Sequence, residues 1–498
     1  MHTVMYLHPG FPDLYDPILE VMKVRKDSEA PSLEKMHNLL TENQWGILDQ
    51  KYVIGGEVGT VNSYINCLRS ETGMTGLMNL GNTCYMNSVL QALYMTERFC
   101  VEVLQAISSP QETVLQKLQE VFAYLKLTQR PAVSPSDFLY VSKPAWFEPG
   151  DQQDCSEFLR FLLDQIEEQQ KSVPSIISDS VSKTDICKYR QSLVNKVFGG
   201  LITTCYTCMM CTKSSIHEDV FTDLHIAFPE EHCKAVQDQP VYQTRSTAKC
   251  PDVLSDEPEG KQSLSLENLV WNYFQTEKLQ GDNQYHCDNC GKLSDAERTV
   301  LVTDPPEHLV LSLLRFAYST STQSRRKFFT NVTCPQVLKL PIDKNTEVLY
   351  SLYAVVVHSG VSAESGHYYT YAQSSEIESE TDRWYLFNDS HVSFSSYKSL
   401  SNLSKRFPRD TAYVLFYRKQ PLTERIQPHL KEELREMVAK DNANFLLEVE
   451  LKSKKQQEKI LKNWTSNWKD DDSPPPAGGC GGGLGLGGMG DIVNRFVF

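Results

Sequence analysis

The sequence predicts an α+β fold, and two patterns in the order of its segments lead to this prediction. From about Gly73 to Ile166, apolar residues recur at the spacing of one helix face. From Leu309 to Tyr417, short segments rich in β-branched and aromatic residues alternate with turn residues, which is typical of strands. Helices first and strands later indicate an α+β domain.

Three helices are expected in the first half, each with one apolar face. The apolar positions run from Met86 to Tyr94, from Leu115 to Leu125 and from Cys155 to Ile166. The strands expected in the second half are Leu309–Phe316, Tyr353–Val357, Tyr368–Tyr371, Trp384–Phe387 and Ala412–Tyr417.

The remaining segments differ in composition from this region. Residues 1–70 hold stretches of helical spacing broken by prolines, and we interpret them as a helical N-terminal segment. Polar inserts near 171–195 and 232–262 are expected to be mobile loops. Residues 422–468 are charged and predict a helical extension, and residues 469–498 are rich in proline and glycine and predict a disordered tail.

Composition limits where the protein acts and what it binds. The chain has 49 Lys and Arg against 63 Asp and Glu, a net charge of −14, which argues against nucleic acid as the main partner. A partner with a basic patch and a plain solvated acidic surface both fit this charge. We find no run of about 18 apolar residues and no secretory signal, so we expect no membrane-spanning segment and a cytosolic or nuclear location. Its 14 cysteines should then be reduced.

Cys84 begins the first predicted helix and is the candidate nucleophile. A cysteine in this place lies at the positive end of the helix dipole, which favours the thiolate. Asn82 or Thr83 can cap the helix. An isolated cysteine would more often be a small buried core residue, so the surrounding segment decides between the two interpretations.

That segment resembles the cysteine box of the ubiquitin-specific proteases, which are papain-like deubiquitinating cysteine proteases. The match runs without a gap from Gly76 to Leu93, through GLMNLGNTCYMNSVLQAL. The resemblance implies that Cys84 is the nucleophile and that Asn79 donates its side-chain amide to the oxyanion. The chemistry agrees, because a tetrahedral intermediate needs a fixed donor beside the backbone N–H of the nucleophile.

A thiol protease also needs a histidine base and a group that orients its ring. His367 follows Gly366 at the start of a predicted aromatic strand, and the next predicted strand is followed by Asn388 and Asp389. Both segments are similar to the histidine box of the same family, which implies that His367 is the general base and Asn388 the third member. The family often has aspartate at the third position. Asp389 could assist, and which of the two contributes more is left open.

A third segment, GDQQDCSEFL, resembles the second box of the family. The resemblance implies that Gln152 lies near the active site and that Asp154 and Glu157 contact the basic C-terminal tail of ubiquitin. Acidic and amide groups in a first helical turn also serve as caps. Gly366 is expected to let a substrate backbone approach closely, and Tyr368 is expected in the same substrate-binding region.

Two C-x-x-C pairs, Cys208 with Cys211 and Cys287 with Cys290, are each half of a tetrahedral thiolate site. The pairs are much farther apart than the about 15–20 residues of a compact zinc ribbon. The family resemblance implies that they meet on two long hairpins at one structural zinc. Four reduced cysteines without a metal are the alternative.

The resemblance covers residues 74–419, the predicted catalytic domain. It implies a papain-like fold with a helical thumb, a β-rich palm and zinc-bearing fingers. It further implies hydrolysis of the isopeptide bond after the C-terminal glycine of ubiquitin, through an acyl-enzyme on Cys84, with ubiquitin and ubiquitinated proteins as partners. Within the family the chain is most similar to members with a helical-repeat arm before the catalytic domain, and residues 1–70 are interpreted as the end of such an arm.

Two rival functions fit part of the pattern. A ubiquitin-binding scaffold without catalysis is favoured only by Asn388, whereas Cys84, His367 and Asn79 argue against it. A protease for a ubiquitin-like modifier would share the chemistry but not the tail contacts. Chain-linkage preference, physiological substrates and oligomeric state do not follow from the sequence.

Overall fold

The structure is a computed structural model, and it describes about two thirds of the chain. The predicted helical segment 1–70, most of both polar inserts and the predicted tail 469–498 lie outside the described residues. The chain divides into two compact units, Met1–Phe445 and Leu446–Phe498, and the site described below belongs to the first. The described residues are 71–107, 113–148, 150–171, 190–229, 264–319, 324–343, 346–362, 365–374, 383–421 and 430–467.

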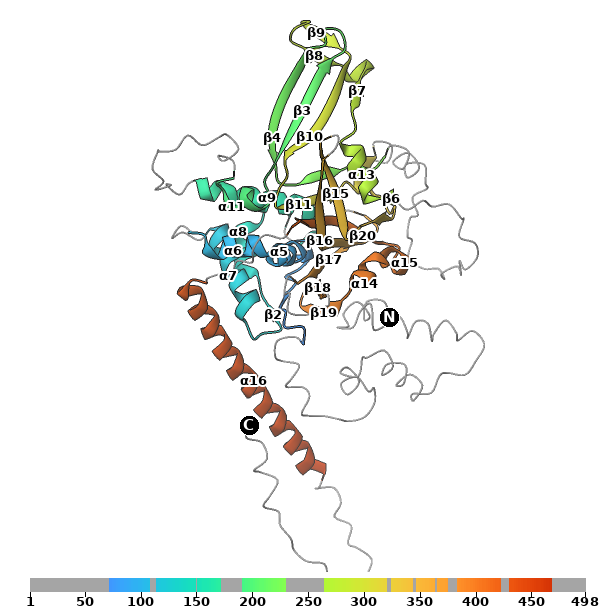
Figure 1. The fold of residues 1–498 in the computed structure, drawn as a ribbon. Coiled ribbons are helices and arrows are strands. Elements are labelled where there is room, and N and C mark those ends of the chain that lie inside the picture. Colours follow the sequence, from blue (N-terminus) through green and yellow to red (C-terminus); the bar gives the residue numbers. More distant parts are fainter. Residues whose placement is uncertain are drawn as a thin grey trace, which may run out of the picture. The chain divides into compact units, whose positions relative to one another are not determined.

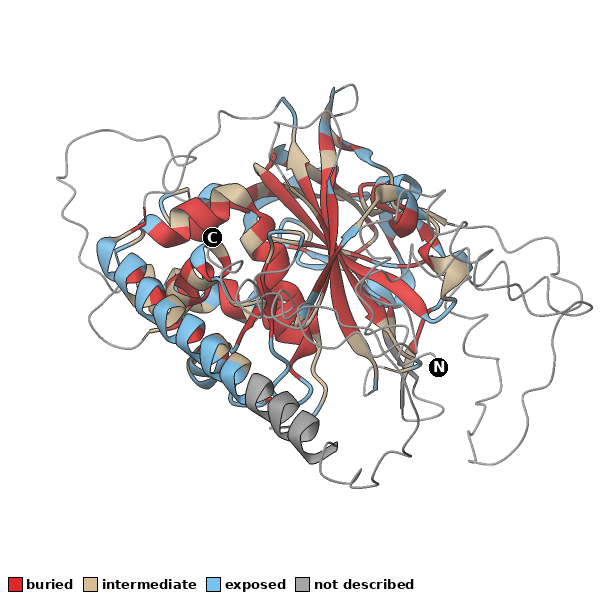
Figure 2. Cartoon of the chain, turned by 90° about the horizontal axis from the view of Figure 1, so that it is seen from below, coloured by how far each residue is buried: buried red, intermediate tan, exposed pale blue. Residues whose placement is uncertain are grey.

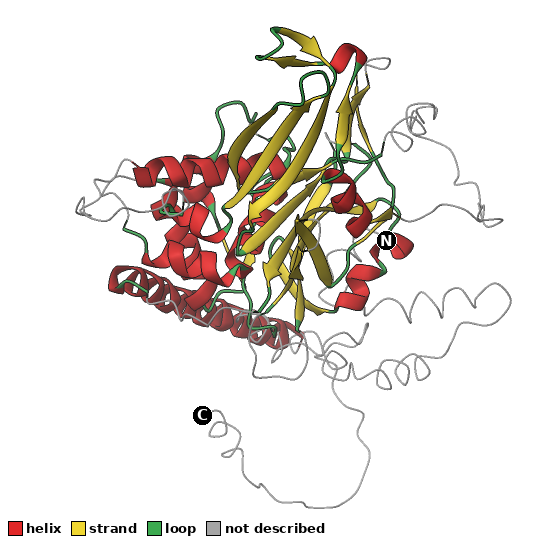
Figure 3. Ribbon diagram, turned by 45° about the horizontal axis from the view of Figure 1, so that its top comes forward, coloured by secondary structure: helices red, strands yellow, loops and turns green. Residues whose placement is uncertain are grey.

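Helices dominate the first half of the described chain and strands the second, so the predicted α+β class is confirmed (Figure 1). Helix α5 is the centre of the helical part, because eleven of its twelve residues are buried, which leaves no solvent-facing stripe. Figure 3 shows these helices gathered on one side of the strands. The helices of this thumb are α5 (Cys84–Met95), α6 (Glu97–Gln105), α7 (Val114–Leu127), α8 (Ser136–Ser142), α9 (Cys155–Lys171) and α11 (Leu193–Val197).

The palm is an eight-stranded sheet in the order β19-β18-β17-β16-β20-β11-β5, with β15 also paired to β16. All of its pairs are antiparallel except that of β11 with β5. The strands are β5 (Leu224–Ile226), β11 (His308–Leu313), β15 (Val337–Asp343), β16 (Thr346–Ser359), β17 (His367–Gln373), β18 (Trp384–Asn388), β19 (His391–Ser395) and β20 (Asp410–Lys419).

Both faces of the palm sheet are buried, as the red strands in Figure 2 show. Along β16, Ala354 and Val356 join the core shared with the thumb helices, whereas Val355 and Val357 join a second core on the opposite face. This explains why β16 reads as a continuous apolar run and not as an alternation.

Small elements border the palm sheet. Strand β1 pairs with β2, β6 with β14, and β12 with β13, while α13, α14 and α15 lie by the second core, to which they contribute Leu266, Leu400 and Leu403. Their bounds are β1 (Gly76–Leu77), β2 (Ala132–Val133), β6 (Leu264–Ser265), β12 (Phe316–Ser319), β13 (Ser324–Lys327), β14 (Val332–Thr333), α13 (Leu266–Tyr273), α14 (Tyr397–Ser401) and α15 (Leu403–Arg406).

The fingers are a four-stranded sheet in the order β4-β3-β10-β7, which extends away from the thumb in Figure 1 and carries the short β8–β9 hairpin at its tip. The family resemblance implied two long hairpins in this region, without strand bounds. The elements are β3 (Gly200–Cys208), β4 (Ser214–Phe221), β7 (Glu277–Leu279), the short helix η2 (Gly281–Asn283), β8 (Tyr285–Cys287), β9 (Lys292–Ser294) and β10 (Ala296–Asp304).

A long helix, α16 (Glu432–Asn467), follows the palm, and its first turns belong to the thumb core. Leu430, Leu434 and Val438 are buried among the thumb residues. The Arg130 guanidinium donates to both carboxylate oxygens of Asp441, at 2.8 and 3.0 Å. Within the part of the chain that the structure describes, no helix is long and apolar enough to cross a membrane.

Candidate active site and metal cluster

Cys84 is the first residue of α5 and is almost fully buried. Thr83 occupies the N-cap position, but its side chain bonds no helix N–H; its hydroxyl accepts from the Leu80 N–H at 2.9 Å instead. Asn82 adopts a left-handed backbone, with φ 55°, and donates its side-chain amide to the Gly150 carbonyl at 2.6 Å. The predicted side-chain cap is therefore not formed by Thr83, and the loop before Cys84 is held by other bonds.

The strand of the candidate base is tied directly to the helix of the candidate nucleophile. Thr370 on β17 donates its hydroxyl to the Ser88 carbonyl on α5 at 2.8 Å, and both residues are buried. His367 begins β17, so this bond anchors its strand beside Cys84.

His367 lies between the Cys84 sulfur and two polar side chains of the β18–β19 turn. Its Nε2 is 2.6 Å from Asn388 Oδ1 and 4.0 Å from Asp389 Oδ2. Burial alone would lower the pKa of His367. The hydrogen bond to Cys84 and the charge of Cys84 outweigh this effect, with smaller contributions from Asp389 and Asn388, and raise the pKa to about 9. The imidazole is therefore protonated at neutral pH, which suits a thiolate partner.

Asp389 does not hold the ring but connects the turn to the segment around Cys84. Its carboxylate accepts from Asn79 Nδ2 at 2.9 Å and from Asn87 Nδ2 at 2.8 Å, and its backbone carbonyl accepts from the Leu77 N–H at 2.9 Å. Asp389 has φ 49°, a left-handed conformation that aspartate tolerates better than most residues. A side chain at Gly76 would collide with the Ser390 backbone, so a glycine is needed where β1 passes this turn.

The second box lies across from the His367 strand. Gln152 donates its side-chain amide to the Gly366 carbonyl, directly before His367. Asp154 caps α9, with one oxygen accepting from the Ser156 N–H at 2.8 Å and the other from the Tyr413 hydroxyl at 2.6 Å. Glu157 accepts from the Trp146 indole N–H at 2.8 Å. All three predicted substrate contacts thus already have protein partners, and Asp154 acts as the cap that such residues commonly provide.

Glycine is required at position 366 by the surrounding protein, whether or not a substrate is bound. A side chain there would collide with the His358 ring and the Ser359 carbonyl, so the position is closed by the protein itself. Tyr368, expected in the substrate-binding region, is buried, with its ring centroid 4.7 Å from that of His358. Burial and then nearby Lys327 lower the pKa of His358 to about 3, so its ring is neutral at physiological pH.

Lys327 is a buried support that the sequence analysis missed. Its Nζ donates to three backbone carbonyls, of His358 at 2.9 Å, Gly360 at 3.0 Å and Arg409 at 2.9 Å. Two of these flank Ser359, which pairs with His367 across β16 and β17. Burial lowers the pKa of Lys327 to about 7. No sequence signal marked it, because lysine is the residue least expected inside a domain.

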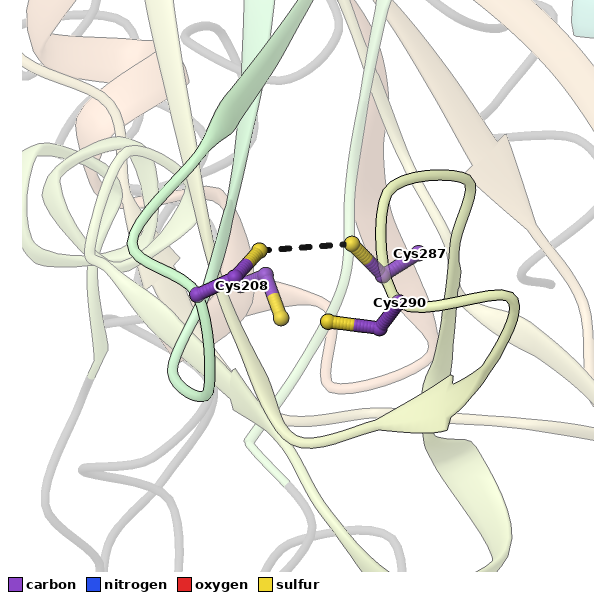
Figure 4. A group of neighbouring side chains, drawn as sticks. Cys208, Cys287 and Cys290 are labelled. Carbon is purple, nitrogen blue, oxygen red and sulfur yellow. Dashed lines mark hydrogen bonds between the residues drawn. The ribbon is translucent and has the colours of Figure 1, made fainter.

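The four predicted metal ligands meet at the tip of the fingers. The sulfur atoms of Cys208, Cys211, Cys287 and Cys290 all lie within 4.8 Å of one another, and those of Cys211 and Cys287 are 3.6 Å apart. Figure 4 shows the cysteines facing one another from two turns. A hydrogen bond from the Lys213 backbone is the main cause that lowers the pKa of the Cys211 thiol to about 6. Cys205, which could have formed an overlapping pair, is not in the cluster.

The fold brings together the residues that the sequence placed in separate boxes. Cys84, His367 and Asn388 form one line of contacts, and Asn79 joins them through Asp389. Asn87 was missed, although it stands in the segment that identified Cys84. Its hydrogen bond to Asp389 joins two residues that are 302 positions apart in the chain, so the segment around Asn87 does not reveal it.

Comparisons with known proteins agree with this geometry. The family profile described as "Ubiquitin carboxyl-terminal hydrolase" matches residues 75–417. Ubiquitin carboxyl-terminal hydrolase 35 of Homo sapiens is 31% identical over all of this chain and 63% of its own length. Ubiquitin carboxyl-terminal hydrolase 48 of Gallus gallus is 27% identical over 76% of this chain and 35% of its own length. The chain thus spans less than two thirds of either relative.

A shorter relative and a solved structure cover the same region. Ubiquitin carboxyl-terminal hydrolase 4 of Arabidopsis thaliana is 26% identical, over 69% of this chain and 92% of its own length. The solved structure is described as the SAGA Ubp8/Sgf11/Sus1/Sgf73 DUB module bound to ubiquitin aldehyde. It matches with a TM-score of 0.51 and 21% identity, covering 79% of this chain and 77% of that one. This likeness bears on the fold alone.

Proposed function

Because the chain belongs to the ubiquitin carboxyl-terminal hydrolase family, we propose that it is a thiol protease that cleaves the bond after the C-terminal glycine of ubiquitin. One observation carries the proposal. Cys84 begins a helix, contacts His367, and His367 is held at 2.6 Å by Asn388, which together make a nucleophile, a base and an orienting group.

The reaction would proceed through an acyl-enzyme. The Cys84 thiolate attacks the carbonyl carbon of the terminal glycine, the C–N bond breaks, and His367 gives its proton to the leaving lysine amine. Water then attacks the thioester and loses a proton to His367, which releases ubiquitin and restores the thiolate. The raised pKa of His367, about 9, supports its role as the acid in the first half of the cycle.

The oxyanion of each tetrahedral intermediate needs fixed donors. Asn79 is exposed, and its amide nitrogen is already fixed on one side by the bond to Asp389 at 2.9 Å. Its second N–H is the donor that we assign to the oxyanion, with the backbone N–H of Cys84 as its partner. An exposed amide held by the protein can meet the oxyanion without reorganising, which is the condition for electrostatic stabilisation.

For substrate contacts we propose Gln152, Asp154, Glu157, Gly366 and Tyr368. Gln152 bonds Gly366, the residue directly before His367, so the tail of ubiquitin would pass beside this pair. Glu157 is half-buried and keeps carboxylate capacity beyond its one bond from Trp146, which a basic tail could use.

We further propose that the four-cysteine cluster holds one structural zinc. Tetrahedral zinc with Zn–S bonds of about 2.3 Å places its sulfurs about 3.8 Å apart, and sulfurs that all lie within 4.8 Å of one another can close to that geometry with small rotations. Four thiolates leave no open position, so such a metal would supply folding energy to the fingers and take no part in the chemistry.

The deciding experiment is turnover of ubiquitin carrying a C-terminal fluorophore. We expect the intact protein to release the fluorophore and Cys84→Ser to release almost none while still binding ubiquitin. A ubiquitin probe with a thiol-reactive C-terminus should label Cys84 alone. An unlabelled, inactive protein that binds ubiquitin would favour a scaffold instead, and turnover of ubiquitin-like modifiers but not ubiquitin would name a different substrate.

We also propose that the protein acts in the cytosol or nucleus, where a free catalytic thiol and four metal-binding thiols stay reduced. Imaging of the tagged chain in intact cells would test this, and accumulation in a secretory compartment would contradict it.

A further inference from the structure

Asn87 is a buried amide one helical turn after Cys84, and nothing above gives it a role in the reaction. Its side chain is 2% exposed. Its Nδ2 lies 2.8 Å from Asp389 Oδ1, 3.2 Å from the Met78 carbonyl and 3.4 Å from the Leu77 carbonyl. The two hydrogens of one amide can serve a carboxylate and a backbone carbonyl at the same time.

The groups that Asn87 holds are the two supports of the proposed oxyanion donor. Leu77 and Met78 lead directly into Asn79, so their carbonyls fix the backbone that carries the donor. Asp389 receives the Asn79 amide on its other oxygen, at 2.9 Å. Asn87 therefore restrains Asn79 from both ends, through its backbone and through its amide nitrogen.

The hydrogen bonds of Asn79 leave a single direction for its remaining N–H. Its Oδ1 accepts from the Gly81 N–H at 3.0 Å and the Thr83 N–H at 3.2 Å, which fixes the plane of the amide. One N–H points to Asp389. None of the described residues accepts from the other N–H, so one donor of this exposed side chain remains available to a substrate.

From this geometry we infer that Asn87 is the positioning residue of the oxyanion donor, acting on Asn79 through Asp389 and through the 77–78 backbone. The inference rests on the proposed function, since it assigns the source of the precision that the donor needs. A displacement of such a donor by a fraction of an ångström weakens transition-state stabilisation without changing ground-state binding.

Gln91 offers a matched control in the same helix. It lies one turn farther along α5, is also 2% exposed, and donates its Nε2 to the Thr75 carbonyl at 2.9 Å. It therefore tethers the residue just before β1 but does not reach Asp389 or the 77–78 carbonyls. Losing Gln91 removes a buried hydrogen bond of similar kind and leaves the donor network intact.

The test compares Asn87→Ala, Gln91→Ala and Asn79→Ala on the fluorogenic ubiquitin substrate, together with the melting temperature of each. We expect Asn87→Ala to lower kcat about 10–10²-fold with KM within about 2-fold, somewhat less than the about 10²–10³-fold of removing a donor itself. Gln91→Ala should lower the melting temperature by a similar amount and keep kcat within about 3-fold. Asn87→Ala combined with Asn79→Ala should be no slower than Asn79→Ala alone, because both remove the same interaction.

Alkylation of Cys84 by iodoacetamide supplies a readout without an oxyanion. Its rate reports the thiolate and the His367 contact only, so Asn87→Ala should leave it within about 2-fold of the unaltered protein. Asn87→Asp, which keeps the side-chain size but places a second carboxylate beside Asp389, covers the case in which the alanine variant fails to fold, and it should also lose kcat and retain alkylation.

Two results would overturn the assignment while leaving the protease function standing. If the unaltered protein turns over ubiquitin and Asn87→Ala has the same kcat, Asn87 does not position the oxyanion donor. If Asn87→Ala and Gln91→Ala lose kcat and alkylation equally, Asn87 is only a structural residue of the helix. Failure of the protease function itself would appear separately, either as no turnover by the unaltered protein or as turnover that Cys84→Ser does not abolish.

Discussion

Nε2 of His367 and Oδ1 of Asn388 lie 2.6 Å apart, so an amide oxygen holds the ring of the catalytic base that we propose. The carboxylate next to it, that of Asp389, is 4.0 Å from the same nitrogen and is occupied by two asparagine amides. The two neighbouring residues of the turn thus serve different partners: Asn388 faces the base, and Asp389 faces the segment that carries the nucleophile.

This division predicts that variants at Asn388 and Asp389 differ in how they change kcat and the rate of Cys84 alkylation. Asn388→Ala should lower kcat about 10–10³-fold and also slow alkylation of Cys84, because the ring loses its orientation. Asn388→Asp should keep activity. Asp389→Ala should lower kcat with alkylation largely retained, because it disturbs the donor Asn79 first. If Asp389→Ala stops both reactions and Asn388→Ala neither, Asp389 is the third member of the triad.

The pH dependence of kcat/KM should have an alkaline limb near pH 9. The folded pKa of His367 is about 9, above its usual 6.5, so the ring carries its proton at neutral pH and loses it as the pH rises through about 9. Without that proton it cannot protonate the leaving amine. Asn388→Asp should move the limb to higher pH, since a carboxylate favours the charged ring. His217→Gln, an exposed histidine of the fingers, is the control and should leave the limb in place.

Elemental analysis of the purified protein should find one zinc per chain. Cys287→Ser should lose the metal and unfold the fingers, with a smaller effect on alkylation of Cys84, because metal binding supplies its folding energy locally. Cys205→Ser is a matched control, since Cys205 lies on the same finger sheet but outside the cluster, and it should keep the metal. Zinc well below one per chain, or loss of metal in Cys205→Ser, would contradict the ligand set.

The first turns of α16 should be essential to the thumb although they follow the predicted domain 74–419. Leu434→Ala should lower the free energy of unfolding by about 2–5 kcal/mol, the usual cost of a cavity in a core, because Leu434 packs into the thumb core. Leu447→Ala, on the same helix but 58% exposed, should change it by less than about 0.5 kcal/mol. Chemical denaturation of both variants measures these changes. Equally small changes in the free energy of unfolding would show that the core does not need the helix.

Sequence patterns predicted the elements that depend on local spacing. The helix that begins at Cys84 and the strand that begins at His367 were both identified, because apolar periodicity and turn residues act over a few positions. The residues of the cysteine box, the second box and the histidine box followed from resemblance, since each of their segments is a contiguous string.

Contacts between distant segments could not be predicted in this way. Lys327 supports the His367 strand by donating to carbonyls, and any residue can supply a carbonyl, so no pattern marks the acceptors. The contact of Arg130 with Asp441 joins positions 311 residues apart and needs the folded thumb to be recognised. Gly366 was predicted to matter because of its small size, but its crowding by the His358 ring could not be predicted from the sequence.

The docking of α16 also has a consequence for the synthesis of the chain on the ribosome. The 311 residues between Arg130 and Asp441 take about 15–60 s to synthesise at about 5–20 residues per second. Early in that interval the last thumb helices, α8, α9 and α11, are synthesised, while the helix that covers the thumb is made only at its end. The apolar surface that Leu430, Leu434 and Val438 later fill is exposed for that time, and it is the natural place for a chaperone to bind the nascent chain.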